Sequence, residues 1–214
     1  MNVALIAAKQ LEFAKTRLAA TMAAPDRKAL AEAMYRDVLG AALAARRADH
    51  VAVISSDRTL LEVARRAGAI VIDEGYPRGL NAAVKLATGV LAAEGTTALC
   101  VVLSDIPLVT GPDIDAVFEA AAANGGVVLV PSRDLTGTNM IVRTPPAAIA
   151  TRFGRQSLMA HVKICEKAGV PYAIVRQPGT ALDIDLASDL ADFARVPGST
   201  HTLNELARMG MAQL

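Results

Sequence analysis

The stretch ALCVVLSDIPLV, residues 98–109, joins a continuous apolar run to an aspartate. Six apolar residues in succession, Ala98 to Leu103, are typical of a strand covered on both faces, as in a parallel sheet. Asp105 follows this run, and the Ile-Pro pair after it favours a turn. In open α/β sheets, ligands bind beyond the carboxyl ends of the strands. The stretch therefore predicts both the type of sheet and the edge at which a site should lie.

Strand-like and helix-like runs alternate along the rest of the chain. The expected strands cover residues 3–7, 51–55, 69–72 and 126–131, and the expected helices cover residues 25–48, 57–67, 79–94 and 112–124. Beyond residue 131 we expect short strands within 132–145 and 171–176, helices within 152–169 and 199–209, and a strand end that turns into a helix within 183–196. No linker or repeat interrupts this order. It predicts one α/β domain over residues 1–214, with a doubly wound, mostly parallel sheet.

The composition excludes several classes of protein. The net charge is only +1, from 22 basic and 21 acidic residues, which does not indicate a nucleic-acid-binding surface. No segment reaches the roughly 20 apolar residues needed to span a bilayer, and the opening MNVALIAAKQ lacks the basic start of a signal peptide. Cys100 and Cys165 match no zinc spacing and are expected to be buried thiols in a reducing cytosol. We therefore expect a cytoplasmic protein without nucleic-acid or membrane partners.

The first expected strand is followed by the segment AAKQLEFAKTRLA, residues 7–19, which carries Lys9, Lys15 and Arg17. A polyphosphate requires converging positive charge of this kind. The alternative is a solvated basic loop. Neither of the glycine-rich phosphate-binding motifs, G-x-x-x-x-G-K-[ST] or G-x-G-x-x-G, occurs in the chain. This first loop is therefore the candidate for holding nucleotide phosphates.

Two further acids occur in LDIDLASDL, residues 182–190. In an extended segment Asp183 and Asp185 share one side, while Ile184 points to the other, toward the core. Two carboxylates on one side repel each other unless a cation lies between them, so the pattern indicates a divalent-cation site that Asp105 would complete. An ordinary turn or cap is the alternative for Asp105. Asp189 is expected on the surface of the following helix.

Three weaker motifs have small polar or glycine residues. In DEGYPRGLNAAV, residues 73–84, Gly79 and Asn81 could frame a base or ribose, or simply begin a helix. TGTNM, residues 136–140, and RFGRQSLMAH, residues 152–161, offer hydroxyl and backbone N–H donors for a small anion. Ser157 in the last motif could instead be an ordinary helix cap, and His161 could contact a ligand or be structural.

No nucleophile-plus-base pair is evident in the sequence. Cations together with acids fit metal-assisted phosphoryl or nucleotidyl transfer, in which positioning and charge neutralisation replace covalent catalysis.

Taken in order, the segments AKTRLA, LNAAV, LSDIPLV, GTNM, FGRQSLMAH and DIDLASDL resemble the guanylyltransferases of coenzyme F-420 biosynthesis, the CofC/FbiD family. The resemblance covers residues 5–190. It implies a Rossmann-like fold of the nucleotide-diphosphosugar-transferase type. It also implies a reaction in which GTP and a small phosphorylated acid form a GDP-linked diphosphate and pyrophosphate. The acid is 2-phospho-L-lactate, phosphoenolpyruvate or 3-phospho-D-glycerate, depending on the member.

The resemblance also assigns roles to individual residues, in four groups. The groups are Mg²⁺ ligands (Asp105, Asp183, Asp185), catalytic residues (Lys9, Lys15, Arg17, Asp105), residues that bind the nucleotide's phosphates or base (Lys9, Lys15, Arg17, Leu80, Asn81) and the acid site (Thr138, Gly154, Ser157). This chain departs from many members at Ala7-Ala8, where they have Pro-Val, so the first loop matches less closely than the acids.

Two other functions remain open at this point. One is another nucleotidyltransferase of the same fold, of the molybdopterin-guanylate or sugar-nucleotide type, and the other is a catalytically silent nucleotide-binding module. The sequence does not select the acid. The tail TLNELARMGMAQL, residues 202–214, is compatible with a homodimer or with internal packing.

Overall fold

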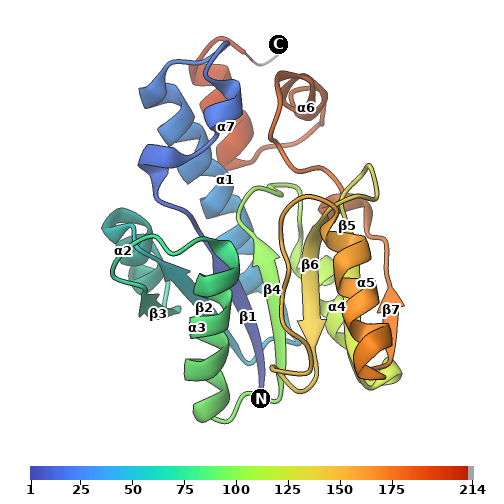
Figure 1. The fold of residues 1–214 in the computed structure, drawn as a ribbon. Helices are drawn as coiled ribbons and strands as arrows, with labels where there is room; N and C mark the ends of the chain where they lie inside the picture. The colour runs from blue at the N-terminus through green and yellow to red at the C-terminus, as the bar shows by residue number, and fades with distance from the viewer. Residues whose placement is uncertain (212–214) are drawn as a thin grey trace.

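The computed structural model describes residues 1–211 and is built around a seven-stranded sheet in the order β3-β2-β1-β4-β6-β5-β7 (Figure 1). The strands are β1 (Asn2–Ala7), β2 (His50–Ser55), β3 (Ile70–Asp73), β4 (Ala98–Leu103), β5 (Val127–Pro131), β6 (Thr138–Arg143) and β7 (Tyr172–Ile174). Among these strands only β6 runs antiparallel to its neighbours, β4 and β5. The predicted doubly wound, mostly parallel α/β sheet is confirmed.

Up to β5 the helices alternate with the strands, as the sequence pattern predicted. They are α1 (Ala24–Ala44), α2 (Arg58–Arg66), α3 (Leu80–Ala93), α4 (Gly111–Asn124), α5 (Ser157–Ala168), α6 (Ala187–Phe193) and α7 (His201–Arg208), with short 3-10 turns η1 (Leu11–Phe13), η2 (Thr16–Leu18) and η3 (Pro178–Thr180). Side chains of Asp57, Thr110 and Thr200 accept backbone N–H bonds at the starts of α2, α4 and α7. Such caps explain why these helices begin where they do.

Two apolar layers cover the two faces of the sheet. Buried residues of α1, α2 and α4 pack on one face, and those of α3 and α5 pack on the other. A third cluster joins the first turns of α1 to α6 and α7, beyond the carboxyl ends of the parallel strands. In Figure 1 this cluster forms the upper part of the molecule, above the sheet. The carboxyl edge of the sheet therefore lies between the sheet layers and this helical cap.

The expected strand end at Asp183 and Asp185 is wrong. The acids follow the 3-10 turn η3 and lie in an extended segment that belongs to no strand. β7 is an edge strand that ends at Ile174, and the chain then returns across the carboxyl edge of the sheet. One backbone bond, from Ile184 N–H to the Asp105 carbonyl at 3.1 Å, fixes the segment there. The expected inward orientation of Ile184 is confirmed, since its side chain is fully buried.

Two other boundaries differ from expectation. Helix α1 ends at Ala44 rather than at residue 48, because the backbone N–H groups of Arg46 and Arg47 donate to the Asp115 carboxylate instead of continuing the helix. In the tail, α7 packs on α1 through Leu203 and Leu206, so its apolar face is used internally. Residues 212–214 of that stretch lie outside the described residues. In the described part of the chain, none of the helices has the length and apolar character of a membrane span.

Candidate active site

Lys15 is the centre of a charged cluster at the carboxyl edge. Its Nζ donates to Asp105 Oδ2 at 2.9 Å and to Asp185 Oδ1 at 3.1 Å, and its side chain is only 8% exposed. The Lys15 backbone is left-handed, with φ of 50°, a conformation that is uncommon for residues other than glycine. This turn folds the loop after β1 back onto the acids. Three segments that are distant in the sequence therefore meet at one ammonium group, and for Lys15 the alternative of a solvated loop does not hold.

The charges in this cluster stabilise each other. Burial alone would lower the pKa of Lys15, but the charges of Asp105 and Asp185 outweigh it and raise that pKa. Burial alone would raise the pKa of Asp185, but Lys15, and then Arg17 and Lys9, hold that pKa below its ordinary value. Arg17 is exposed and contacts Asp185 Oδ2 at 3.3 Å, whereas Lys9 is exposed and makes no salt bridge within residues 1–211. Lys15 is thus cationic and Asp185 anionic near neutral pH.

The negative charge of Asp183 is less compensated by nearby cations than that of Asp185. Burial raises its pKa, and the negative charge of Asp105 raises it further. Its polar neighbour is the Asn139 amide, at 3.5 Å from Oδ1. Asp105 Oδ1 is buried, and no hydrogen-bond partner reaches it in the described part of the protein. An added cation would reduce the repulsion between these two acids and give the Asp105 oxygen a partner.

These side chains fit a Mg²⁺ site completed by water and substrate better than a site in which the protein supplies every metal ligand. Within residues 1–211, no group of three or more His, Cys, Asp or Glu side chains is arranged to hold a metal ion by itself. The Lys15 ammonium separates Asp105 from Asp185. Mg²⁺ characteristically takes one or two carboxylates and completes its shell with water and substrate phosphates. Three carboxylates beside a cationic loop, two of them paired with Lys15, can supply ligands of this kind.

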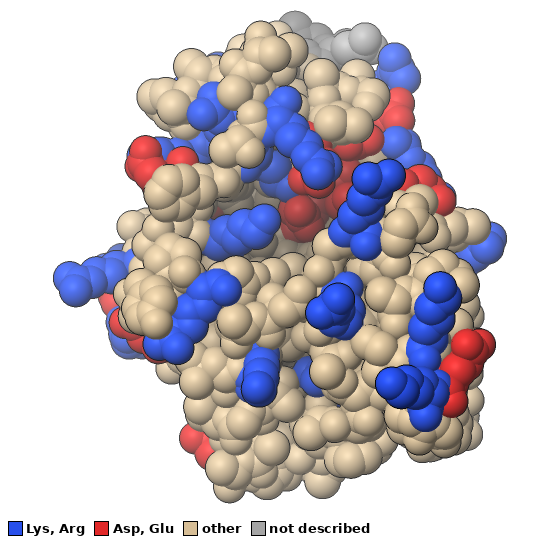
Figure 2. Space-filling model, in the orientation of Figure 1, with Lys and Arg blue, Asp and Glu red and all other residues tan. Residues whose placement is uncertain are grey.

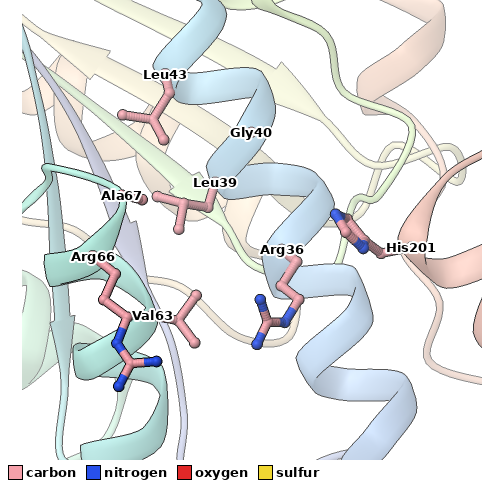
Figure 3. A pocket seen from close by; sticks show the side chains of 8 residues that line it. All are labelled: Arg36, Leu39, Gly40, Leu43, Val63, Arg66, Ala67 and His201. Carbon is pink, nitrogen blue, oxygen red and sulfur yellow. The ribbon is translucent and has the colours of Figure 1, made fainter.

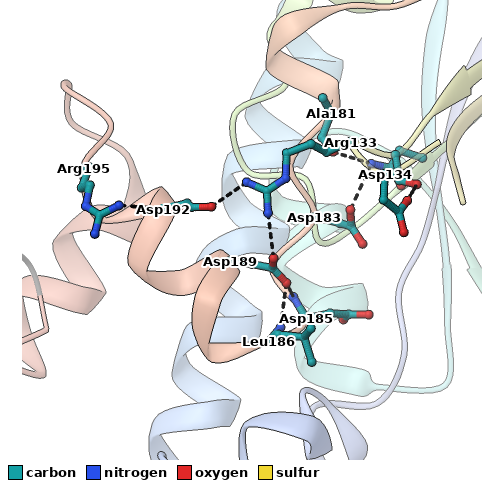
Figure 4. Close-up of polar contacts among 11 residues, drawn as sticks. Arg133, Asp134, Ala181, Asp183, Asp185, Leu186, Asp189, Asp192 and Arg195 are labelled. Carbon is teal, nitrogen blue, oxygen red and sulfur yellow. Dashed lines mark hydrogen bonds and ion pairs between the residues drawn. The ribbon is translucent and has the colours of Figure 1, made fainter. Parts of the chain in front are cut away.

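Asp189 is not the surface residue that the sequence suggested. Its Oδ2 accepts the backbone N–H of Asp185 at 3.1 Å and of Leu186 at 2.8 Å, and its side chain is 14% exposed. Its other oxygen pairs with Arg133, which also contacts Asp192 (Figure 4). The assignment to the helix is correct, since Asp189 lies in α6. Its carboxylate orients the backbone that carries Asp185, which sequence spacing did not reveal.

Thr138 begins β6, so its position at the carboxyl edge follows from the antiparallel direction of that strand. Its Oγ1 lies 3.1 Å from His161 Nδ1, and His161 Nε2 accepts the backbone N–H of Arg152 at 2.8 Å. Burial, with the charge of Arg143 as a second cause, lowers the pKa of His161 to about 4. The ring is therefore neutral at pH 7, its proton is on Nδ1, and that proton is donated to Thr138. The Thr138 hydroxyl keeps its own hydrogen for another acceptor.

Gly154 and Ser157 belong to the loop that leads into α5, next to His161. Gly154 has φ of 126°, a conformation that residues with a Cβ rarely adopt, and its carbonyl accepts the N–H of Ser157 at 3.2 Å. Ser157 is the first residue of α5 and is buried; the helix cap is Gln156. His161 is one turn further on the same helix. Thr138, Gly154 and Ser157 thus lie around one helix start.

The Asn81 amide is engaged on both sides by the same loop. Asn81 Nδ2 donates to the Phe153 carbonyl at 2.9 Å, and Asn81 Oδ1 accepts the Phe153 N–H at 2.8 Å. The Phe153 ring packs edge-on against His161. Leu80, the first residue of α3, is partly buried against the adjoining core. Asn81 therefore links the predicted base side to the loop of Gly154.

Asn139 is a site residue that the sequence reasoning missed. Its amide donates to the Thr180 carbonyl at 2.9 Å and lies next to Asp183, so β6 holds the acidic segment in place. Its position directly after Thr138 in the motif TGTNM was the available signal.

The surface agrees with this placement. In Figure 2 acidic side chains lie in the depth of a hollow above the sheet, and Lys and Arg side chains surround it. A pocket of about 360 Å³ lies elsewhere, beside α1 and α2, and is lined by Arg36, Leu39, Gly40, Leu43, Val63, Arg66, Ala67 and His201 (Figure 3). None of the predicted site residues lines it. Both of its arginines are paired, with Glu32 and Glu62.

Comparison with known proteins gives a consistent result. The family model described as "Guanylyl transferase CofC like" matches residues 2–213. A phosphoenolpyruvate guanylyltransferase from Sphaerobacter thermophilus is 37% identical over 90% of this chain and 92% of its own. A 3-phospho-D-glycerate guanylyltransferase from Phenylobacterium zucineum is 34% identical over 97% and 96%. A 2-phospho-L-lactate guanylyltransferase from Methanothermobacter thermautotrophicus is 32% identical over 96% and 90%.

A solved structure from Desulfovibrio desulfuricans, described as a nucleotide-diphospho-sugar transferase, superposes with a TM-score of 0.79. It covers 98% of this chain and 95% of its own, at 18% identity. This likeness confirms the predicted fold type.

Proposed function

The chain belongs to the CofC-like guanylyl transferase family, and we propose that it is a guanylyltransferase of coenzyme F-420 biosynthesis. Its substrates are GTP and a small phosphorylated three-carbon acid. The relatives are named for phosphoenolpyruvate, 2-phospho-L-lactate and 3-phospho-D-glycerate, three acids that share a carboxylate and a phosphate. The products are a GDP-linked diphosphate and pyrophosphate.

One observation carries the proposal beyond family membership. The Lys15 ammonium lies between Asp105 and Asp185, at the carboxyl edge where parallel sheets bind ligands. An ammonium group together with carboxylates that can hold a divalent cation suits a polyanionic nucleotide, because the two cations offset the repulsion between carboxylates and phosphates. They do not suit a hydrolase that forms a covalent intermediate on Ser or Cys, and both cysteines of the chain are buried.

The reaction requires little proton chemistry from the protein. A phosphate oxygen of the acid attacks the α-phosphorus of GTP in line, and the bond from that phosphorus to the β-phosphate bridging oxygen breaks. The attacking oxygen is already anionic near neutral pH, so no general base is needed. Pyrophosphate leaves with the electron pair of the broken bond. Lys9, Lys15 and Arg17 would bind the phosphates and stabilise the charge that develops in the transition state.

Asp105, Asp183 and Asp185 would hold Mg²⁺, which when bound supplies positive charge to the phosphate oxygens. The buried, unpartnered Oδ1 of Asp105 and the raised pKa of Asp183 support this assignment. Lys15 contributes from the other side by holding Asp105 and Asp185 in place through direct salt bridges.

The acid would bind at Thr138, Gly154 and Ser157. The Thr138 hydroxyl is free to donate because His161 Nδ1–H already occupies its oxygen. The Ser157 hydroxyl and the N-terminal amides of α5 add donors for an anionic group. Leu80 and Asn81 would lie on the base side of GTP, with Asn81 connecting that side to the Gly154 loop.

A pyrophosphate-release assay tests the proposal directly. The full chain is incubated with Mg²⁺, one of GTP, ATP or CTP, and one of the three acids. Release with GTP and one acid supports the proposal and identifies the acid. Release with another nucleotide indicates a different nucleotidyltransferase of this fold. GTP binding without release from any pair indicates a silent nucleotide-binding module.

We also propose a cytoplasmic location, because Cys100 and Cys165 are both buried and unbridged. Cell fractionation tests it. A homodimer remains a prediction; within residues 1–211, the apolar face of α7 packs on α1. Sedimentation equilibrium of the full chain decides it.

A further inference from the structure

We propose that Glu74, with Ser56 beside it, recognises the guanine base of GTP. The inference rests on the proposed function, because it identifies which part of the site distinguishes GTP from other nucleotides. The Glu74 carboxylate would accept N–H bonds from the N1 and the exocyclic N2 of guanine. The Ser56 hydroxyl would donate to the guanine O6.

Both residues contain buried polar atoms without partners. Glu74 is only 7% exposed, and its Oε2 is buried with no hydrogen-bond partner among residues 1–211. The same holds for Ser56 Oγ. A buried carboxylate oxygen without a donor is costly, and such groups in native structures require an explanation. A ligand that brings N–H donors would supply it.

The unpartnered atoms of Ser56 and Glu74 lie at the same edge of the sheet as the charged cluster. The six unpartnered buried side-chain atoms in the described residues include Ser56 Oγ, Glu74 Oε2 and Asp105 Oδ1. Ser56 and Glu74 directly follow β2 and β3, and Asp105 lies two residues past the end of β4, so all three are at the carboxyl edge of the sheet. Asp105 already belongs to the charged cluster of Lys15. The unsatisfied polar atoms therefore extend from that cluster along the edge toward β3.

Backbone bonds hold the two residues at neighbouring positions. The Glu74 N–H donates to the Ser55 carbonyl at 3.1 Å, so the pairing of β2 and β3 continues past the end of β3. The side chain of Gln10, from the loop after β1, reaches the Ser56 carbonyl at 3.4 Å. Side chains alternate along an extended chain, so Glu74 shares the face of Ile72, which packs in the layer of α3. This is the layer whose first residues, Leu80 and Asn81, were assigned to the base side.

The spacing along the sheet matches a bound nucleotide. β3 and β4 are separated by β2 and β1 in the strand order, which makes three steps between neighbouring strands. At about 4.8 Å for each step, Glu74 and Asp105 are about 14 Å apart across the edge. A nucleotide with its α-phosphate at the Asp105 cluster and its sugar over β1 and β2 would bring the base to Glu74.

The chemistry selects guanine. An ionised carboxylate only accepts hydrogen bonds. Guanine presents two donors at N1 and N2, whereas adenine and cytosine present ring-nitrogen lone pairs at the matching edge and would repel the carboxylate. A site with a buried polar group rejects a ligand that leaves the group unpaired, and it does so strongly. Inosine triphosphate lacks only the N2 amine and should bind with intermediate affinity.

The variant Glu74→Gln tests the inference in the full chain. It keeps the side-chain volume but turns one accepting oxygen into an NH₂ group that faces the base donors. We expect GTP affinity, measured by titration calorimetry, to fall about 30-fold, as for the loss of a charge-assisted hydrogen bond. The preference for GTP over inosine triphosphate should shrink, and ATP affinity should not fall. The matched control Glu94→Gln, an exposed residue at the far end of α3, should bind GTP like the wild type.

Thermal unfolding separates recognition from structure. Because Glu74 Oε2 has no hydrogen-bond partner among residues 1–211, the melting temperature of Glu74→Gln should be unchanged or higher. A variant that binds GTP with wild-type affinity overturns the inference. So does a variant that melts lower and loses GTP, inosine triphosphate and ATP binding alike, since Glu74 would then be structural. If wild-type protein releases no pyrophosphate from GTP with any acid, the proposed function fails. If the wild type releases pyrophosphate from GTP but Glu74→Gln binds GTP with unchanged affinity, only the base assignment fails.

Discussion

Replacing Lys15 with methionine should destabilise the protein by about 2 kcal/mol at pH 7. The substitution keeps most of the side-chain stem but removes the ammonium that contacts Asp105 at 2.9 Å and Asp185 at 3.1 Å. Removing one partner of a buried ion pair costs about 3–5 kcal/mol, because the other charge is left unpaired. Here Asp105 and Asp185 are 27% and 38% exposed, so water partly replaces the lysine and the cost falls to about 2 kcal/mol.

The loss should depend on pH in a defined direction. In the wild type the pKa of Asp185 is lowered, so its contribution to stability is present above its ordinary pKa and is lost as the pH falls through the folded value. Without Lys15 the three acids repel one another, and the pKa of Asp185 rises, as burial and Asp105 already cause at Asp183. Protonation of these acids at lower pH then reduces the repulsion between them in the variant. The stability difference between wild type and Lys15→Met should therefore be largest at pH 7 and smaller at pH 4.5.

Urea unfolding at both pH values measures this difference. The matched control is Arg17→Met, which removes a cation from the same Asp185 but at a side chain that is 70% exposed. That control should lose less than about 0.5 kcal/mol. The double variant Lys15→Met/Asp185→Asn should lose less than the sum of the single variants, because both share one contact. A Lys15→Met loss equal to that of the control, or the same loss at both pH values, would refute the reasoning.

Three further predictions concern the proposed chemistry and the loop before β6. Asp183→Asn or Asp185→Asn should lower the rate of pyrophosphate release by about 10²-fold or more with an unchanged circular dichroism spectrum, and near-wild-type turnover in either variant would contradict the metal assignment. His161→Leu should raise the KM for the acid about 10-fold while the KM for GTP stays constant, because the Thr138 hydroxyl loses the hydrogen bond from His161 that orients it. In the wild type, ¹⁵N NMR should show the ring proton of His161 on Nδ1. Hydrogen bonds from Ser132 and Thr136 lower the pKa of Asp134 to about 2. Asp134→Asn should therefore lower the free energy of unfolding at pH 7 by about 1 kcal/mol, a value discounted because Asp134 is exposed. Urea unfolding should show that this loss becomes progressively smaller between pH 4 and pH 2.

The sheet could be predicted because its information is local. The run Ala98–Leu103 is apolar at every position, which identifies a strand buried on both faces and therefore the parallel core. Helices α2 and α7 begin directly after Asp57 and Thr200, which are residue types that favour the N-cap position. The termini of α1 and β7 were less predictable. Arg46 and Arg47 leave the helix for a carboxylate on α4, and such a contact has no signature in the helix itself.

The site was only partly predictable, because its contacts are distant in the sequence. Residue types and the ordered motifs identified Lys15, Asp105 and Asp185 as candidates. That one ammonium joins residues 90 and 170 positions away depends on how the last segment crosses the sheet, which no local pattern specifies. The same reason hid Asn139, whose amide holds that segment, and Glu74, whose unpartnered oxygen is visible only once burial is known.

The charged cluster also explains why the acids tolerate their position before any nucleotide binds. Carboxylates at one sheet edge repel each other, and the fold offsets this repulsion with Lys15, a cation from its own first loop. A nucleotide phosphate is attracted to the same ammonium and repelled by the same acids, so it needs positive charge beyond that of Lys15. Arg17 and Lys9 remain exposed to provide part of it. Asp183, which makes no salt bridge within residues 1–211, and the unpartnered Oδ1 of Asp105 are positioned to attract a metal for the rest. The roles of these residues therefore depend on their pairing: charges that are paired within the protein stabilise the site, and charges that are left unpaired are available to bind the nucleotide and the metal.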